Sequence, residues 1–226
     1  MHIGLIGGMG SVASSVFLQT LYEEFRVSQE SDYPKITYLA DPCAPPRRAG
    51  QEDALRSFIQ QQAQVLWKAG ATDLAICCMV AHSLSIELPL RVHSLKVIAN
   101  EMVEAHGMKN VVFVGGRLLS QDINVQKALF GRDITESFAS QQDSTRFFQI
   151  IEHVKLNALT AEDLTFFKNF AEKHRDKTVI LCCSELHVVV KSVRPDAPSN
   201  VLDPLLVLAQ RLAERNRVER GIRLSQ

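Results

Sequence analysis

The chain has 226 residues, 46% of them apolar, and its 25 basic and 25 acidic side chains leave a formal net charge of zero. This length is enough for one large domain or two small ones. The balanced charge excludes the basic surface typical of nucleic-acid and membrane-surface binding, and no apolar run approaches the ~20 residues that span a bilayer. The N-terminus lacks the basic region of a secretory signal and the five cysteines form no C-x-x-C pair, so we expect a cytoplasmic protein without a structural zinc site.

The first half of the chain alternates between strand and helix patterns. A proline-rich loop at 41–50 is too constrained for a helix or a central strand, and it is long enough to fold over a site. The remaining patterns predict strands at 3–6, 34–39, 74–77 and 97–99, and helices from Ser11, at 52–68, weakly at 84–88, and at 100–106.

The second half continues the alternation. The patterns predict strands from Asn110, from Ile134 and at 179–182, and helices at 121–130, 143–156, 160–174 and 205–220. Strands that alternate with helices favour an α/β fold with a doubly wound parallel sheet in each half. We therefore expect two pseudo-symmetric domains, at 1–100 and 101–204, with the last helix, 205–220, packing back on the first.

Two pairs of residues recur at nearly the same offset. Gly7-Gly8 returns as Gly115-Gly116, 108 residues later, and Cys77-Cys78 returns as Cys182-Cys183, 105 residues later. Each pair ends a short apolar run that predicts a buried strand. If the two units pack about an approximate two-fold axis, one cysteine of each pair faces a shared cleft. We expect it to be the second of each pair, Cys78 and Cys183, because side chains alternate along a strand and sites lie at strand ends.

Two thiols on opposite walls of one cleft can invert a stereocentre. A thiolate takes a proton from a carbon, and a thiol on the other wall returns a proton to the opposite face. The ordinary thiol pKa of about 8.5 makes both protonation states accessible. The glycines at 7–10 open a helix, whose backbone N–H groups suit a substrate carboxylate. The opposing interpretation is that all four cysteines are small buried side chains, which we favour for Cys77 and Cys182.

Three motifs together resemble the aspartate/glutamate racemases that use no pyridoxal phosphate. They are Ile6-Gly7-Gly8-Met9-Gly10, Cys78-x-x-Ala81-His82 and Cys183-Ser184-Glu185-Leu186, in the family's order and spacing. The resemblance implies a site between two α/β domains, Cys78 and Cys183 as the acid–base pair, and a small amino-acid or related carboxylate substrate. It also implies a homodimer, no cofactor and no metal.

The resemblance also implies which residues bind the substrate. Arg47 falls where the family has an arginine for the side-chain carboxylate, and Lys155 falls near a lysine that assists it. The other implied contacts come from Met9, Gly10, Met79, Val80, Ser184 and Glu185. The family usually has Asn and Thr where this chain has Met79 and Val80, so polar contacts are lost and an altered specificity, toward a less polar side chain than that of aspartate, is expected.

Two other functions remain open at this stage. An inactive or regulatory relative would keep the cleft without turnover, and Met79 and Val80 favour it. A dinucleotide-binding oxidoreductase would use the glycines at 8 and 10, with Asp41 on a ribose. For His82 and His187, which lie just after the two cysteines, a structural role is favoured over a catalytic one.

Overall fold

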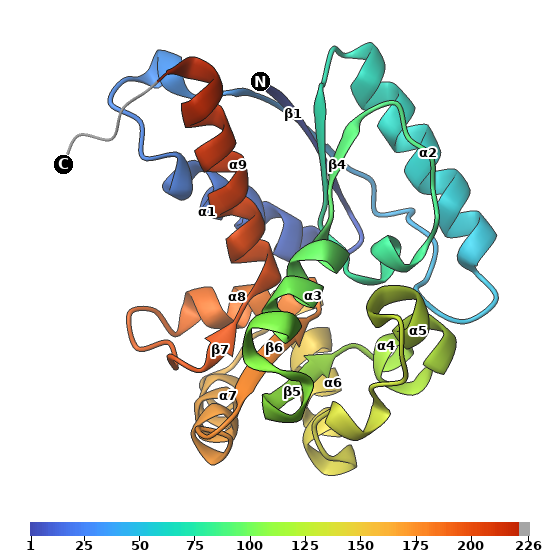
Figure 1. Ribbon diagram of the computed structural model, residues 1–226, viewed down its shortest axis with the longest axis vertical. Coiled ribbons are helices and arrows are strands. Elements are labelled where there is room, and N and C mark those ends of the chain that lie inside the picture. The colour runs from blue at the N-terminus through green and yellow to red at the C-terminus, as the bar shows by residue number, and fades with distance from the viewer. Residues whose placement is uncertain (222–226) are drawn as a thin grey trace.

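The computed structural model describes residues 1–221, which form two parallel sheets flanked by helices (Figure 1). The first sheet has the order β2-β1-β3-β4, and the second has the order β5-β6-β7. This confirms the predicted α/β class with one parallel sheet in each half. The strands are β1 (His2–Gly7), β2 (Lys35–Ala40), β3 (Asp73–Ile76), β4 (Arg91–His93), β5 (Val111–Gly115), β6 (Thr178–Cys182) and β7 (Val201–Leu202).

The first sheet is covered on both faces because its strands are apolar on both faces. Ile3 and Leu5 belong to a cluster with α1 (Ser11–Phe25) and α9 (Pro204–Arg220), whereas Ile6 faces α2 (Glu52–Lys68). Successive side chains of a strand point to opposite faces, so this alternation places one helical layer on each side. The last helix, α9, lies along α1 in the first half of the molecule (Figure 1).

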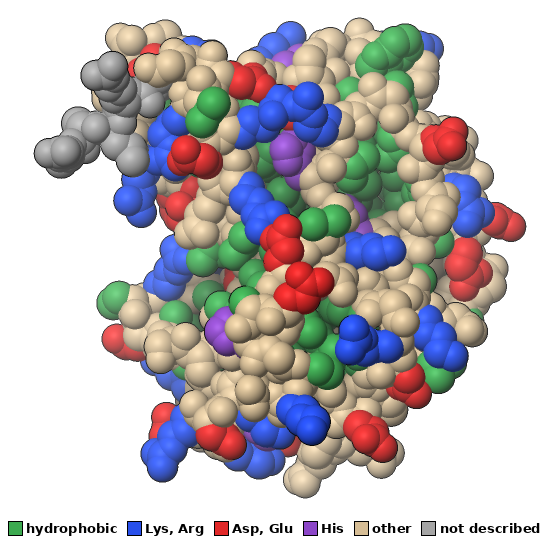
Figure 2. Space-filling view, in the orientation of Figure 1, with side chains coloured by type: hydrophobic (Ala, Val, Ile, Leu, Met, Phe, Trp, Pro, Cys, Tyr) green, Lys and Arg blue, Asp and Glu red, His purple; other side chains and the backbone are tan. Residues whose placement is uncertain are grey.

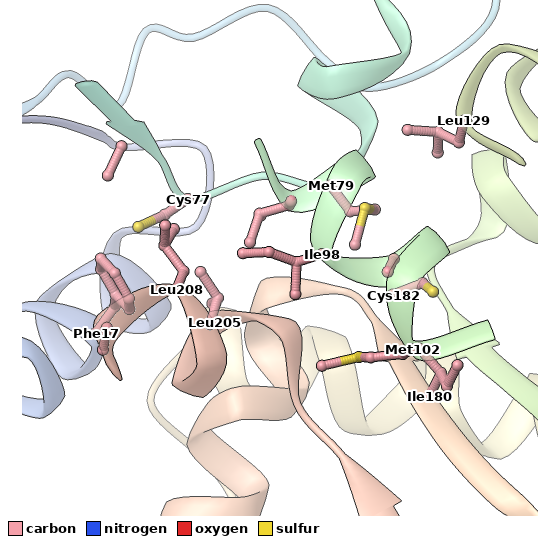
Figure 3. Close-up of a cluster of buried hydrophobic side chains, with 14 of the residues drawn as sticks. Phe17, Cys77, Met79, Ile98, Met102, Leu129, Ile180, Cys182, Leu205 and Leu208 are labelled. Atoms are coloured by element: carbon pink, nitrogen blue, oxygen red, sulfur yellow. The ribbon is translucent and has the colours of Figure 1, made fainter. Parts of the chain in front are cut away.

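The second sheet is covered in the same manner. Val112 and Val114 face one cluster, and Val111 and Phe113 face the cluster that also contains Ile3 and Leu5 of the first sheet. The remaining helices are α3 (Leu95–His106), α4 (Arg117–Gln121), α5 (Ile123–Phe130), α6 (Gln141–Lys155), α7 (Ala161–Lys173) and α8 (Ser184–Ser192). One buried cluster is therefore shared by both halves, and Figure 3 shows Cys77 and Cys182 within it.

Two predictions around residue 90 are wrong. Residues 97–99 are helical, because Ser94 accepts a hydrogen bond from Val97 N and so begins α3 before them. The strand lies upstream, at β4. The weak helix at 84–88 is also absent, since a 3-10 turn at Val80–Ser83 follows Cys78-Met79 directly and Leu84 is extended. Residue 100 falls within α3, so the proposed boundary between 1–100 and 101–204 stays a prediction.

Two predictions in the second half need correction. The helix expected at 121–130 is two helices, because the Asp122 carboxylate accepts hydrogen bonds from Asn124 N and Val125 N and caps α5. Ile134 starts no strand. A 3-10 turn follows it, and Phe138 instead forms an isolated bridge with Phe113 of β5.

The outer surface mixes the two signs of charge. Figure 2 shows acidic and basic side chains interspersed over the face that it draws. Within residues 1–221, no helix combines the length and the apolar character needed to cross a bilayer.

Candidate active site

Both predicted thiols line one cavity between the two sheets. Cys78 follows β3 and Cys183 follows β6, and the cavity between them has a volume of about 190 Å³. Drug-sized ligands occupy pockets of about 300–1,000 Å³, so this cavity suits a smaller molecule such as an amino acid. Of the other residues implied as substrate contacts, the structure brings seven to the same cavity: Met9, Arg47, Met79, Val80, Lys155, Ser184 and Glu185.

Cys78 lies in a tight turn after β3. Its backbone N–H donates to Ile76 O at 2.9 Å, and the 3-10 turn that follows presents the N–H groups of Val80 and Ala81 to its sulfur. Burial raises the pKa of Cys78, while the positive charge of Arg47 and these N–H groups act in the opposite direction. The pKa of Cys78 stays raised overall, and Arg47 limits the rise that burial and the charge of Glu185 produce.

Cys183 is held in its thiol form. It precedes α8, and its Sγ donates to Glu185 Oε2 at 2.9 Å, an oxygen that also accepts from Ser184 Oγ at 3.1 Å. Burial and the negative charge of Glu185 raise the pKa of Cys183 well above its ordinary value. The two walls thus differ, with a cation beside Cys78 and a carboxylate beside Cys183.

Glu185 reaches from the second half to the first helix of the chain. Its side chain is buried, and its Oε1 lies where a Cβ on Gly10 would be only 2.5 Å away. Gly10 also has a φ of 138°, which residues with side chains rarely adopt. Gly10 is not among the residues that line the cavity, and its lack of a side chain leaves room for the Glu185 carboxylate; its contact with a substrate stays a prediction.

The loop 41–50 covers part of the cavity through Arg47. The guanidinium donates to Met9 O at 3.1 Å and to Pro45 O at 3.3 Å, which fixes the arginine against the glycine turn. The start of this loop lies on Gly8, where a Cβ would be 2.1 Å from Asp41 O. The Asp41 carboxylate accepts from Cys43 N at 2.8 Å. The loop thus covers the glycine turn, and the Asp41 carboxylate is bonded within the loop. Neither contact supports a dinucleotide site.

Met79 and Val80, which replace the usual Asn and Thr of the family, are largely packed against other apolar side chains. Met79 is 3% exposed and lies in the cluster shared by the two halves, near Leu129 in Figure 3. Val80 is half-buried at the cavity wall. Lys155 is exposed at the rim, where it pairs with Glu152 at 2.7 Å.

Eight residues of the cavity wall were not predicted as site residues. Gly116 lies beside Cys183, because a Cβ there would be 3.7 Å from Sγ. The others are Cys182 of β6, Arg117, Leu118 and Leu119 of α4, and Phe148, Ile151 and Glu152 of α6. The repeated glycine pair was a signal for Gly116, but nothing in the spacing indicated which face of α6 would meet the cavity.

The two histidines after the cysteines are structural. His82 Nε2 is 3.2 Å from Ile76 O, and burial lowers the pKa of His82 to about 4. His187 is buried between Thr20 and Asp203. Neither ring is among the described residues that line the cavity. Over the range 1–221, no group of three or more His, Cys, Asp or Glu side chains is placed to hold a metal ion.

Comparison with known proteins shows which family the chain matches. Residues 6–212 match the family described as Asp/Glu/hydantoin racemase. The fold is similar to that of Picrophilus torridus aspartate racemase, with 20% identity over 99% of this chain and 96% of that one, and a TM-score of 0.77. It is also similar to glutamate racemase from Campylobacter jejuni, with 15% identity over 100% of this chain and 88% of that one, and a TM-score of 0.61.

A further solved structure contains an amino acid. Glutamate racemase from Francisella tularensis, in complex with D-glutamate, is 14% identical over 99% of this chain and 83% of that one, with a TM-score of 0.53. At these identities, the three structural similarities establish a shared fold.

Proposed function

Because the chain belongs to the Asp/Glu/hydantoin racemase family, we propose that it is a cofactor-independent amino-acid racemase that moves protons between the substrate α-carbon and the pair Cys78 and Cys183. The observation that carries the proposal is the placement of the two thiols in one cavity of about 190 Å³. Arg47 opposes the rise in the pKa of Cys78, whereas burial and Glu185 raise the pKa of Cys183 well above its ordinary value, so Cys78 is the thiol that ionises more readily.

The first direction of the reaction uses Cys78 as the base. Its thiolate takes the α-proton, which breaks the C–H bond on one face and leaves a carbanion. The Cys183 thiol then donates its proton to the opposite face, so that Cys78 ends as a thiol and Cys183 as a thiolate. Arg47, which lines the cavity, binds a substrate carboxylate, and its positive charge stabilises the developing carbanion.

The reverse direction requires Cys183 as the base. It starts from the protonation state that the first direction leaves, with Cys183 as the thiolate and Cys78 as the thiol, and Cys183 takes the α-proton of the opposite enantiomer. Cys78 then donates its proton to the other face and is the thiolate again. Glu185, which accepts the hydrogen bond of the Cys183 thiol, is a positioning residue that favours the protonated form of Cys183.

Two further statements remain expectations from the sequence, namely a homodimer and a cytoplasmic location. An amino acid as the ligand is supported by the family and by the size of the cavity. The departures at Met79 and Val80 keep a ligand-binding relative without turnover as the second candidate.

Solvent-deuterium exchange at the α-carbon tests the proposal. The protein is incubated in heavy water with each enantiomer of the common amino acids, and deuterium incorporation and racemisation are followed by NMR and chiral chromatography. We expect incorporation with at least one amino acid, loss of racemisation in Cys78→Ala and Cys183→Ala, and retention in Cys77→Ala, whose side chain is buried beside Cys78 in the core. A variant with one thiol left can still exchange the α-proton of one enantiomer without racemising it. The enantiomer that exchanges then identifies the face of the α-carbon on which the remaining thiol acts.

Two results would contradict the proposal. Racemisation at the wild-type rate by either Cys78→Ala or Cys183→Ala would exclude the two-thiol mechanism. Tight amino-acid binding without any deuterium uptake would establish the ligand-binding alternative.

A further inference from the structure

Arg117 is a cavity residue for which the mechanism above has no use. It is the first residue of α4 and follows Gly116, which lies against Cys183 Sγ. Its side chain is exposed at the rim of the cavity, on the wall formed by the second half. Arg117 therefore directly follows Gly116, the glycine that lies beside Cys183.

The guanidinium of Arg117 is held by a ring. Its Cζ is 4.6 Å from the centroid of Phe148, a buried residue of α6 that also lines the cavity. Stacking uses the flat face of a guanidinium and leaves its N–H donors at the edge available for a carboxylate. An arginine fixed in this manner loses less conformational freedom when it binds a ligand.

The other two cations of the cavity each have a partner within the protein. Arg47 donates to Met9 O and Pro45 O, and Lys155 pairs with Glu152. By contrast, the Arg117 side chain makes no hydrogen bond or ion pair with any residue in the part of the chain that the structure describes. Its donors are thus available to a bound molecule.

Several apolar side chains share the cavity lining with Arg117 and the two thiols. They are Phe148 and Ile151 of α6 and Leu118 of α4, and Met79 and Val80 offer no side-chain donors. A substrate side chain along this wall would have methylene groups against apolar atoms and its far end near Arg117. A charged far end is compatible with this wall only if Arg117 binds it.

We propose that Arg117 determines specificity by binding the side-chain carboxylate of a dicarboxylic amino acid. The role rests on the proposed function of the cavity, and it assigns to this arginine the polar contact that Met79 and Val80 do not provide. The substrate class is then the acidic amino acids rather than those with a less polar side chain.

The test compares ligands that differ only in this charge. Calorimetric binding of glutamate against glutamine, and of aspartate against asparagine, is measured for the wild type, Arg117→Met and Arg117→Lys, with the exposed Arg132→Met as the matched control. A hydrogen bond to a charged group contributes about 1.5–3 kcal/mol, or roughly 10- to 100-fold in affinity. We expect Arg117→Met to lower the affinity for the acid about 10-fold or more and to change the affinity for the amide by less than about 2-fold. Arg132→Met should bind both ligands with the affinity of the wild type.

Several outcomes separate this inference from the racemase proposal. Arg117→Lys should fall between the wild type and Arg117→Met, because an ammonium keeps the charge but lacks the planar fork of donors. An acid-to-amide ratio that is the same in Arg117→Met as in the wild type, or a wild type that prefers the amide, would overturn the role of Arg117. The calorimetric measurement does not depend on turnover. Deuterium exchange with monocarboxylic amino acids and with no dicarboxylic one would refute the role of Arg117 and leave the racemase proposal intact.

Discussion

Replacement of Gly10 by alanine tests the contact between the two halves at the cavity. The new Cβ would be 2.5 Å from Glu185 Oε1 and 3.3 Å from Glu185 Cδ, at a φ of 138°. Such a backbone conformation costs about 1–3 kcal/mol in a residue with a side chain, and overpacking costs about 1–3 kcal/mol more. The Glu185 carboxylate can turn away from the new Cβ, which weakens the hydrogen bonds that its Oε2 accepts from Cys183 and Ser184. We therefore expect Gly10→Ala to lower the free energy of unfolding by about 3 kcal/mol, or the melting temperature by roughly 6–12 °C.

Gly131→Ala is the matched control for this change. Gly131 also has a positive φ, of 71°, but a Cβ added there would have nothing within 4 Å, so only the backbone cost of about 1–2 kcal/mol applies. Urea unfolding of both variants, and of Gly10→Ala combined with Glu185→Ala, measures the contribution of the clash. The double variant should be more stable than the two separate losses predict, because the clash is then absent. Equal losses for Gly10→Ala and Gly131→Ala would refute the reasoning.

Three further changes follow from the charged and polar contacts. Arg47→Met should move the rise of kcat/KM to higher pH, because Cys78 loses the cation that opposes its raised pKa, whereas the exposed neighbour Arg48→Met should leave the pH profile unchanged. His187→Ala should cost about 3 kcal/mol in urea unfolding, because the buried Asp203 carboxylate loses its partner; a cost below about 1 kcal/mol would contradict this. Asp73→Asn should cost about 2 kcal/mol at pH 7 and progressively less below pH 4, and an equal cost at pH 7 and pH 3 would contradict the reasoning.

The sign for Asp73 follows from its surroundings. Burial raises its pKa, but hydrogen bonds from His93 and Thr72 and the charge of Arg215 together outweigh burial and hold the pKa of Asp73 below its ordinary value. A carboxylate with a lowered pKa in the folded state stabilises the fold above its unfolded pKa, and this stability is lost as the pH falls through the folded value.

The sequence predicted the parts of the site that follow strand ends. Residues after β3 and β6 lie at the same edge of their sheets, so the cavity position of Cys78 and Cys183 followed from periodicity and repetition alone. Cys77 and Cys182 are buried in the shared cluster as predicted, although Cys182 also borders the cavity. The helix at 52–68 was also predicted with its observed bounds, since its amphipathic pattern is long and unbroken.

Other features depend on contacts that no local pattern contains. Arg117 and Phe148 are 31 residues apart, and their stacking depends on how α4 and α6 are placed around β5. The possible role of Asp41 on a ribose could be judged only from the approach of the loop to Gly8. The strand predicted at 97–99 failed because a side-chain cap, Ser94, starts a helix ahead of an apolar stretch that also fits a strand.

The return of α9 to the first half has a consequence for how the protein is made. Leu205, Leu208 and Leu212 complete the apolar layer over the first sheet, although more than 180 residues separate them from Phe17 and Leu21 of α1. A nascent chain that has left the ribosome only as far as the second sheet still exposes that layer to water. The N-terminal half therefore cannot complete its core until α9 has been synthesised. We expect chaperones to bind the nascent chain most strongly just before residue 204 leaves the ribosome.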